Sequence, residues 1–148
     1  MIGPVVKIDE RLLPRLPNIH YLGQQDYQAL PAYLKAFDVA MMPFALNEAT
    51  RAISPTKTLE YMAAHRPVVS TAVRDVVSLY GEVVRIADGP GAFVAAVQAA
   101  LDEGAPERER RLGRERDLLR RSSWDRIAAD MDALVRDRLG RGSKRRTL

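Results

Sequence analysis

A lysine and a glutamate three residues apart stand in the part of this sequence best suited to chemistry. Lys57 and Glu60 lie in the stretch Ser54-Pro-Thr-Lys-Thr-Leu-Glu60. The pattern predicts a helix over 55–64 with Ser54 as its N-cap and Pro55 at the first helical position. Residues three apart share one face of a helix. A lysine at a helix amino end favours a bound phosphate, and a carboxylate one turn further on is suited to accept two ribose hydroxyls.

The competing interpretation of Lys57 and Glu60 is a surface ion pair, worth a few tenths of a kcal/mol. Spacing alone leaves both interpretations open. The sequence contains neither a G-x-G-x-x-G fingerprint nor a P-loop, so no standard phosphate motif decides between them. Arg51 stands shortly before the predicted phosphate site and is either a further phosphate contact or a solvated loop residue.

The elements that must position this pair follow from the apolar pattern. Continuous apolar runs predict buried strands, and apolar residues spaced three and four apart predict helices. Strands are expected at 18–22, 39–44, 67–71 and 83–87, and helices at 28–37, 55–64, 93–101, 107–121 and from Trp124 onward. The alternation predicts an α/β fold with a parallel sheet covered on both faces. Ligands of such sheets bind beyond the carboxyl ends of the strands, where we expect the loops 23–27 and 46–57.

Composition limits the class of protein. The 148 residues suffice for one domain with a core, and 28% of them are charged. The absence of cysteine excludes disulfides and thiolate metal sites, and two histidines are too few to suggest a metal cluster. The sequence contains no apolar run of membrane-spanning length and no secretory signal, so a cytoplasmic location is expected, with peripheral contact with a membrane left open.

The C-terminal third carries the positive charge. Residues 1–104 have a net charge of −2 and residues 105–148 one of +6. Arg and Glu dominate 107–121, which predicts a solvated helix, and acids such as Glu103 are expected on the surface. The stripe that begins at Trp124 predicts a last helix anchored on the body of the protein. A second domain and anionic lipid headgroups are both open as partners of the arginines.

Several blocks of this sequence resemble one known family. They are Asn18–Gly23, Leu30–Leu34, Ala36–Val39, Pro43-Phe44, Pro55-Thr-Lys57 with Glu60-Tyr-Met-Ala63, and Pro67–Val69. Together they resemble the C-terminal donor-binding domain of GT-B glycosyltransferases, in particular the retaining group 1 set from bacterial polysaccharide assembly. The resemblance covers roughly 1–135, and its most specific part is Pro-x-Lys-x-x-Glu-Tyr-Met-Ala.

The resemblance implies a fold and roles for individual residues. It implies a Rossmann-like half that binds a nucleotide diphosphate sugar and needs no metal or cofactor. Glu60 would bind the ribose hydroxyls, and the residues from Ser54 through Thr56 to Lys57 would lie against the diphosphate. Gly23, Gln24 and Gln25 would lie beside the base. The domains implied are 1–104 for the nucleotide sugar, 105–138 for helices packed on it, and 139–148 for a disordered basic tail.

The sequence also departs from the family pattern. Many members carry a second glutamate where this chain has Ala52, so the sugar contact is assigned to Asn47, Glu48 or Arg51. His65 replaces the usual glycine, which predicts a left-handed and slightly strained residue before Pro67. The acceptor domain is absent from this sequence, so the chain is expected to be a fragment that binds nucleotide weakly and transfers little or no sugar.

The function expected from these features is that of a glycosyltransferase donor-binding domain. The alternative is a non-catalytic nucleotide-binding or regulatory α/β module, which Ala52 favours slightly. Binding of nucleic acid is not expected, because acids are interleaved with the arginines of the C-terminal third and Trp124 is its one aromatic residue. The base, the sugar and the acceptor are not specified by the sequence.

Overall fold

The computed structural model describes residues 1–6 and 8–144, with side chains as far as residue 140. It divides into two compact units, Met1–Phe37 and the residues from Asp38 onward. Each unit is described by itself. The three-part division expected from the sequence stays a prediction.

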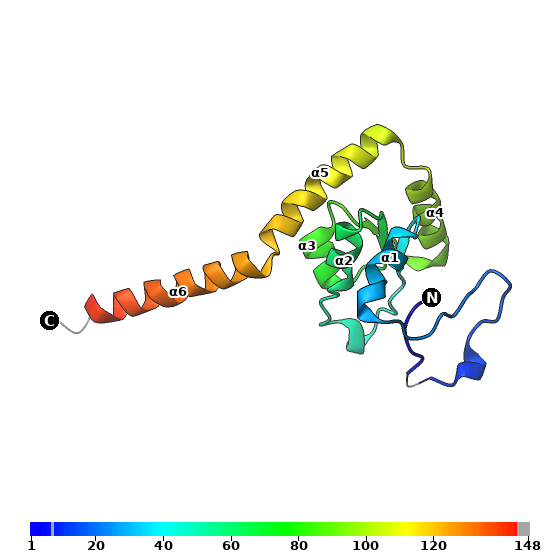
Figure 1. The fold of residues 1–148 in the computed structure, drawn as a ribbon, viewed down its shortest axis with the longest axis horizontal. Coiled ribbons are helices and arrows are strands. Elements are labelled where there is room, and N and C mark those ends of the chain that lie inside the picture. The colour runs from blue at the N-terminus through cyan, green and yellow to red at the C-terminus, as the bar shows by residue number, and fades with distance from the viewer. Residues whose placement is uncertain (7, 145–148) are drawn as a thin grey trace. The chain divides into compact units, whose positions relative to one another are not determined.

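A three-stranded parallel sheet lies at the centre of the second unit (Figure 1). β1 (Ala40–Met42), β2 (Val68–Ser70) and β3 (Arg85–Ile86) follow one another across the sheet. All of β2 is buried, so both faces of the sheet are covered there. Met41 on the edge strand β1 is 55% exposed, because one face of that strand is open. This architecture confirms the predicted α/β fold with a parallel sheet and surrounding helices.

Helices connect the strands and cover them. α2 (Lys57–Ala63) joins β1 to β2, and α3 (Arg74–Tyr80) joins β2 to β3. α4 (Gly89–Leu101) packs against β2 and β3, and α5 (Ala105–Arg121) packs against α2 and precedes α6 (Trp124–Lys144). The core is made of small and medium apolar side chains, among them Met62, Val68, Val69, Val73 and Val76.

The first unit contains little regular structure. It holds the 3₁₀ turns η1 (Glu10–Leu12) and η2 (Tyr27–Ala29) and the helix α1 (Leu30–Lys35). The strand predicted at 18–22 does not form in this described segment, so that prediction is wrong. The Leu22 N–H donates to the Met1 carbonyl at 2.9 Å and the Gly3 N–H to the Gly23 carbonyl at 2.8 Å, but these bonds do not extend into a ladder.

The C-terminal helices correct three expectations. Trp124 is 84% exposed and does not anchor α6 on the body of the protein. The buried side chains Arg111 and Glu115 show that α5 is not solvated all round. Residues 139–144 belong to α6 rather than to a disordered tail, and 145–148 lie outside the described residues.

His65 confirms the predicted left-handed turn. Its φ is 59°, and its N–H donates to the Met62 carbonyl while the Arg66 N–H donates to the Tyr61 carbonyl. This arrangement closes the end of α2 and turns the chain into β2. The conformation is unfavourable for a residue with a Cβ atom.

Replacing His65 with glycine is expected to stabilise the protein by about 0.5–1 kcal/mol, because glycine adopts positive φ without steric cost. Chemical denaturation monitored by circular dichroism measures the change. Ala64→Gly is the matched control, since Ala64 has a φ of −83° and glycine there brings only an entropic loss. If the His65→Gly variant is no more stable than the Ala64→Gly variant, the prediction that the backbone of His65 is strained is wrong.

Candidate functional site

The helix that carries the candidate site begins later than predicted. α2 starts at Lys57 with Thr56 as its N-cap residue, and no side chain caps it. Ser54 is therefore not the cap, and Pro55 is not in the helix. The Thr58 N–H donates to the Pro55 carbonyl at 3.2 Å, which closes a tight turn ahead of the helix. Because α2 has only seven residues, its dipole is small, and a bound anion would depend mainly on side chains.

Two hydroxyl contacts, one buried and one half-buried, hold this region at the carboxyl ends of the strands. Thr58 is fully buried, and its Oγ1 lies 3.7 Å from the Sδ atom of Met42, the last residue of β1. Thr71, which follows β2, donates from its Oγ1 to the Phe44 carbonyl at 2.9 Å. The first turn of α2 therefore lies beside the end of β1, the edge at which parallel sheets bind ligands.

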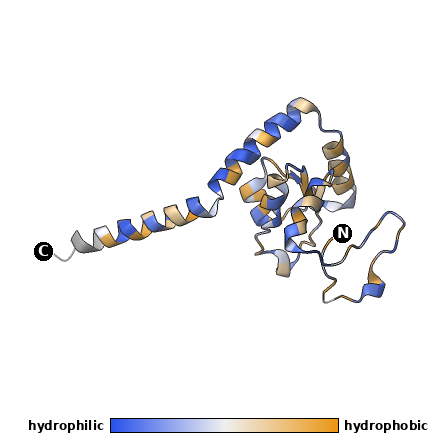
Figure 2. Ribbon diagram, viewed as in Figure 1, coloured by the Kyte–Doolittle hydropathy of each residue, from blue (hydrophilic) through white to orange (hydrophobic). Residues whose placement is uncertain are grey.

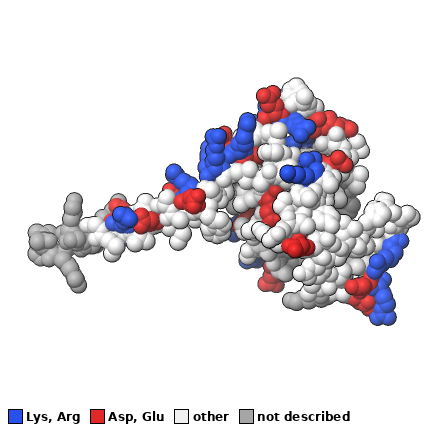
Figure 3. All heavy atoms as spheres, viewed as in Figure 1, with Lys and Arg blue, Asp and Glu red and all other residues white. Residues whose placement is uncertain are grey.

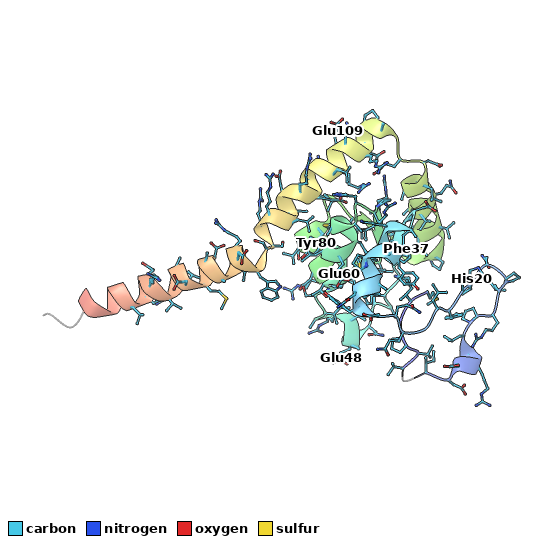
Figure 4. The ribbon with its side chains drawn as sticks, in the orientation of Figure 1. His20, Phe37, Glu48, Glu60, Tyr80 and Glu109 are labelled. Atoms are coloured by element: carbon cyan, nitrogen blue, oxygen red, sulfur yellow. The ribbon has the colours of Figure 1, made fainter. Side chains whose placement is uncertain are left out.

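Lys57 and Glu60 form an exposed ion pair on α2, and Figure 4 labels the Glu60 member of the pair. The Lys57 Nζ donates to the Glu60 Oε2 at 2.7 Å, and the two side chains are 52% and 37% exposed. This is the surface ion pair that the sequence left open. An exposed pair of this kind contributes less than about 1 kcal/mol, so a ligand can take both groups at little cost. Both interpretations of the spacing are therefore compatible with the geometry.

Tyr61 is half-buried and lies near enough to Lys57 and Glu60 for their charges to affect it. Burial raises the pKa of its hydroxyl, the Lys57 charge lowers it and the Glu60 charge raises it. The Tyr61 hydroxyl is therefore neutral near pH 7, and Tyr61 is an uncharged neighbour of Lys57 and Glu60.

The loop between β1 and α2 uses one candidate residue for its own structure. Asn47 caps the short turn η3 (Glu48–Thr50), where its side chain accepts from the Thr50 N–H at 3.2 Å and the Asn47 N–H donates to the Thr50 Oγ1 at 3.0 Å. Asn47 is therefore less available to a ligand than predicted. Glu48 and Arg51 are exposed and are the better candidates for a sugar contact.

The residues expected beside a base belong to the first unit. Gly23 has a φ of 66°, which explains glycine at this position. Gln25 donates from Nε2 to the Leu22 carbonyl and accepts at Oε1 from the Tyr33 hydroxyl at 2.9 Å, so both ends of its amide are engaged. Gln24 is exposed. Contact of these three residues with a ligand stays a prediction.

Comparison with known proteins identifies the family of this chain. The family described as Glycosyl transferases group 1 matches residues 2–103, more than half of the chain. The chain belongs to the group 1 glycosyltransferases. It is 28% identical over 116 residues to the putative teichuronic acid biosynthesis glycosyltransferase TuaH of Bacillus subtilis (strain 168). The match covers 76% of this chain and 29% of that relative, so the chain spans less than a third of the relative's length. No solved structure matches the chain.

Two further features bear on this glycosyltransferase chain. Within the described residues, His, Cys, Asp and Glu form no group of three placed to hold a metal ion. Across the same residues, no helix combines the length and the apolar character needed to cross a membrane.

The sequence analysis missed a buried ionic network on α5. The Arg111 guanidinium pairs with Glu103 at 2.8 Å and with Glu115 at 2.7 Å. The three side chains are 8%, 5% and 1% exposed, so Glu103 is not the surface acid that was expected. Arg85 extends the network to Glu107 at 2.8 Å. The signal lay in the spacing, because Arg111, Glu115 and Leu118 follow one helix face at i, i+4 and i+7.

This network also lines a hollow of about 310 Å³ in the glycosyltransferase chain. Its walls come from the start of β3 and from α5, and they include Arg85, Glu103, Arg110 and Arg114. None of the predicted site residues lines it. The hollow lies at the amino end of β3, and most of its charged groups pair with one another, so we do not assign the donor to it.

The network makes stability depend on pH. Burial raises the pKa of the Glu115 carboxyl above its ordinary 4.5, Arg111 lowers it, and Glu103 raises it. The Glu115 Oε2 is buried without a hydrogen-bond partner among the described groups. The folded state binds the proton of the Glu115 carboxyl more tightly than the unfolded state does. This carboxyl therefore stabilises the folded state below pH 4.5, and the stabilisation is lost as the pH rises through the folded-state pKa of Glu115.

The Glu115→Gln substitution is expected to remove the loss of stability that ionisation of Glu115 causes as the pH rises. The free energy of unfolding of the variant minus that of the original protein should rise with pH above 4.5 and then level off. Urea denaturation across a pH series measures the difference, with the exposed Glu109→Gln as the control. A difference independent of pH would contradict a raised Glu115 pKa.

Proposed function

We propose that this chain is the donor-binding part of a retaining glycosyltransferase of the GT-B type, corresponding to its C-terminal half. The proposed donor is a sugar linked to a nucleoside diphosphate. Membership of the group 1 family over residues 2–103 is the observation that carries the proposal. The exposed Lys57–Glu60 pair at the carboxyl edge of the sheet supports it, because the pair offers a cation and a carboxylate side by side.

The proposed roles follow from charge. Lys57, with Arg51 from the preceding loop, would neutralise the negative charge that builds on the departing diphosphate, which lowers the barrier to transfer. Glu60 would accept hydrogen bonds from the ribose hydroxyls and so fix the position of the nucleoside. Glu48 is the candidate for a sugar hydroxyl, and no protein-bound metal or cofactor is required by this scheme.

The acceptor side is proposed to come from a separate N-terminal domain. The relative named for teichuronic acid biosynthesis is much longer than the match, and we propose that this chain likewise serves the assembly of a polysaccharide. The isolated chain should therefore bind donor weakly and transfer little or no sugar. Efficient sugar transfer by the 148-residue chain alone would contradict the proposal that a separate domain supplies the acceptor site.

A panel of nucleotides tests the donor site. Ligand-observed NMR of the chain with UDP, GDP, ADP and dTDP should show saturation transfer to one diphosphate more than to the others. The matching nucleoside monophosphate should bind more weakly, because it presents less charge to Lys57. Failure of every diphosphate to bind at millimolar concentration would contradict the proposal.

The second candidate is a non-catalytic nucleotide-binding module. Ala52, in place of the glutamate that the family resemblance leads one to expect, favours it. Both candidates bind nucleotide, so binding alone does not separate them. Hydrolysis or transfer of the sugar by the chain combined with an acceptor domain would exclude the module.

A further inference from the structure

The loop between β1 and α2 has no apolar core of its own. It runs through residues 43–56, and none of them is fully buried. Strong hydrophobic colour in Figure 2 lies elsewhere, for example along α4, which packs against β2 and β3. Ordering a loop costs conformational entropy at each of its residues. Contacts other than apolar burial must therefore hold the backbone that carries the exposed residues Glu48 and Arg51.

Two threonine hydroxyls bind successive carbonyl groups at the start of this loop. The Thr71 Oγ1 donates to the Phe44 carbonyl at 2.9 Å, and the Thr50 Oγ1 donates to the Ala45 carbonyl. Thr71 follows the last residue of β2, whereas Thr50 belongs to the loop itself. The two carbonyls are therefore held from two sides, one by the sheet and the other by the turn η3 within the loop.

The Thr50 hydroxyl also builds η3. It accepts from the Asn47 N–H at 3.0 Å, while the Asn47 side chain accepts from the Thr50 N–H. Glu48 is the first residue of η3. Arg51 follows the last residue of η3, and its N–H donates to the Glu48 carbonyl at 3.3 Å. The backbone positions of Glu48 and Arg51 therefore depend on the Thr50 hydroxyl.

Thr71 is firmly attached to the sheet. Its N–H donates to the Met42 carbonyl at 3.2 Å, which joins the ends of β1 and β2. The residue before it, Ser70, is fully buried. The hydroxyl of Thr71 thus extends the order of the sheet to the Phe44 carbonyl and from there into the loop.

We propose that Thr50 and Thr71 are positioning residues of the donor site. They hold the loop that leads into α2, so that Glu48 and Arg51 are presented in one arrangement before the donor binds. Neither threonine touches the donor in this scheme. A loop that is already ordered avoids the ordering cost on binding, so loss of either hydroxyl should weaken binding. This proposal rests on the proposed donor-binding function.

The competing explanation is that the two hydroxyls contribute only to overall stability. The backbone already provides one contact at the start of the loop, because the Phe44 N–H donates to the Met42 carbonyl at 3.0 Å. If that contact suffices, removing a hydroxyl lowers the fraction of folded chains and leaves the loop of each folded chain unchanged. A positioning role instead predicts that the loop loosens while the sheet stays folded.

Amide hydrogen exchange of the full chain, measured by NMR, separates the two explanations. Thr71→Val removes the hydroxyl and keeps the shape of the side chain. The N–H groups of Thr50 and Arg51, which do not contact Thr71, should then exchange about 2- to 10-fold faster, the range for loss of one hydrogen bond. Thr71→Ser keeps the hydroxyl and should restore the original rates. Val76→Ala, which removes buried volume from α3, should lower stability without changing these rates.

Inorganic pyrophosphate is the probe for binding. The arginines grouped along α5 in Figure 3 offer this anion a competing site, so affinity is measured from the amide signals of Lys57 and Thr58 in the first turn of α2. Thr50→Val and Thr71→Val should each weaken this binding about 2- to 10-fold, and the two serine variants should not. Lys57→Gln should weaken it as well, because the cation is lost. Ser78→Ala removes an exposed hydroxyl from α3 and should leave binding unchanged.

The outcomes distinguish failure of the positioning role from failure of the donor site. Exchange rates or pyrophosphate affinity that both valine variants leave intact would overturn the positioning role, and so would a Val76→Ala variant that matches Thr71→Val in both. Thr50→Val changes a loop without buried residues, so it decides the question even where Thr71→Val does not fold. If the unchanged chain does not bind pyrophosphate at Lys57, the donor site itself is wrong, and the threonines have no donor residues to position.

Discussion

Replacing Arg111 with methionine is expected to cost about 3–5 kcal/mol of stability. The substitution keeps an apolar stem of similar length but removes the one guanidinium that pairs with both Glu103 and Glu115. Two carboxylates that are 5% and 1% exposed would then lie close together without their shared counter-charge. Urea denaturation near pH 7 measures the loss, and part of the stability should return at acid pH, where the carboxylates gain protons.

The control for this prediction lies on the same helix. Arg110 is exposed, so Arg110→Met should change stability by no more than about 0.5 kcal/mol. Adding Glu103→Gln and Glu115→Gln to Arg111→Met should recover stability, because the uncompensated charges are then removed. Equal effects of Arg110→Met and Arg111→Met would mean that the buried network contributes nothing.

Replacing Glu60 with alanine is expected to weaken binding of the preferred nucleoside diphosphate by about 1.5–3 kcal/mol, or roughly 10- to 150-fold. The proposed reason is the loss of a charged acceptor for the ribose hydroxyls. Stability should change little, because the ion pair that Glu60 makes with Lys57 is exposed. Ligand-observed NMR titration measures the affinity, and thermal unfolding checks the fold.

Two companions sharpen the Glu60 experiment. Glu109→Ala removes an exposed glutamate from α5 and should leave the affinity unchanged. Nucleosides without phosphate should also lose affinity on Glu60→Ala, since the ribose contact does not involve the diphosphate. Unchanged nucleotide affinity of the Glu60→Ala variant would mean that Glu60 pairs only with Lys57 and does not contact the donor.

Most of the second unit was predictable from the sequence. Continuous apolar runs produce buried parallel strands, and β1, β2 and β3 fall within the predicted runs. The helix at Arg74–Tyr80 was not predicted, since it is short and contains two adjacent valines, which favour strands. The start of α2 was placed too early, because a cap signal such as Ser54-Pro55 also fits the tight turn that precedes the helix.

The candidate site was predictable in outline only. The spacing of Lys57 and Glu60 correctly placed both side chains on one helix face. The sequence does not show which loop residues form hydrogen bonds within their own loop. The hydrogen bonds of Asn47 and Gln25 depend on the path of the folded backbone. Burial of Arg111 was obscured by the many exposed arginines around it. Its spacing with Glu115 and Leu118 marks one face of α5, and the contact of α5 with α2 shows that this helix packs against the body of the unit.

The buried charges at Arg111 have a thermal consequence. Warming makes the hydration of ions less favourable, so the penalty for holding Arg111, Glu103 and Glu115 away from water shrinks. The attachment of α5 should therefore retain its strength on heating, while regions held by apolar contact alone gain nothing comparable. On heating, other parts of the second unit are therefore expected to unfold before the attachment of α5 through Arg111, Glu103 and Glu115.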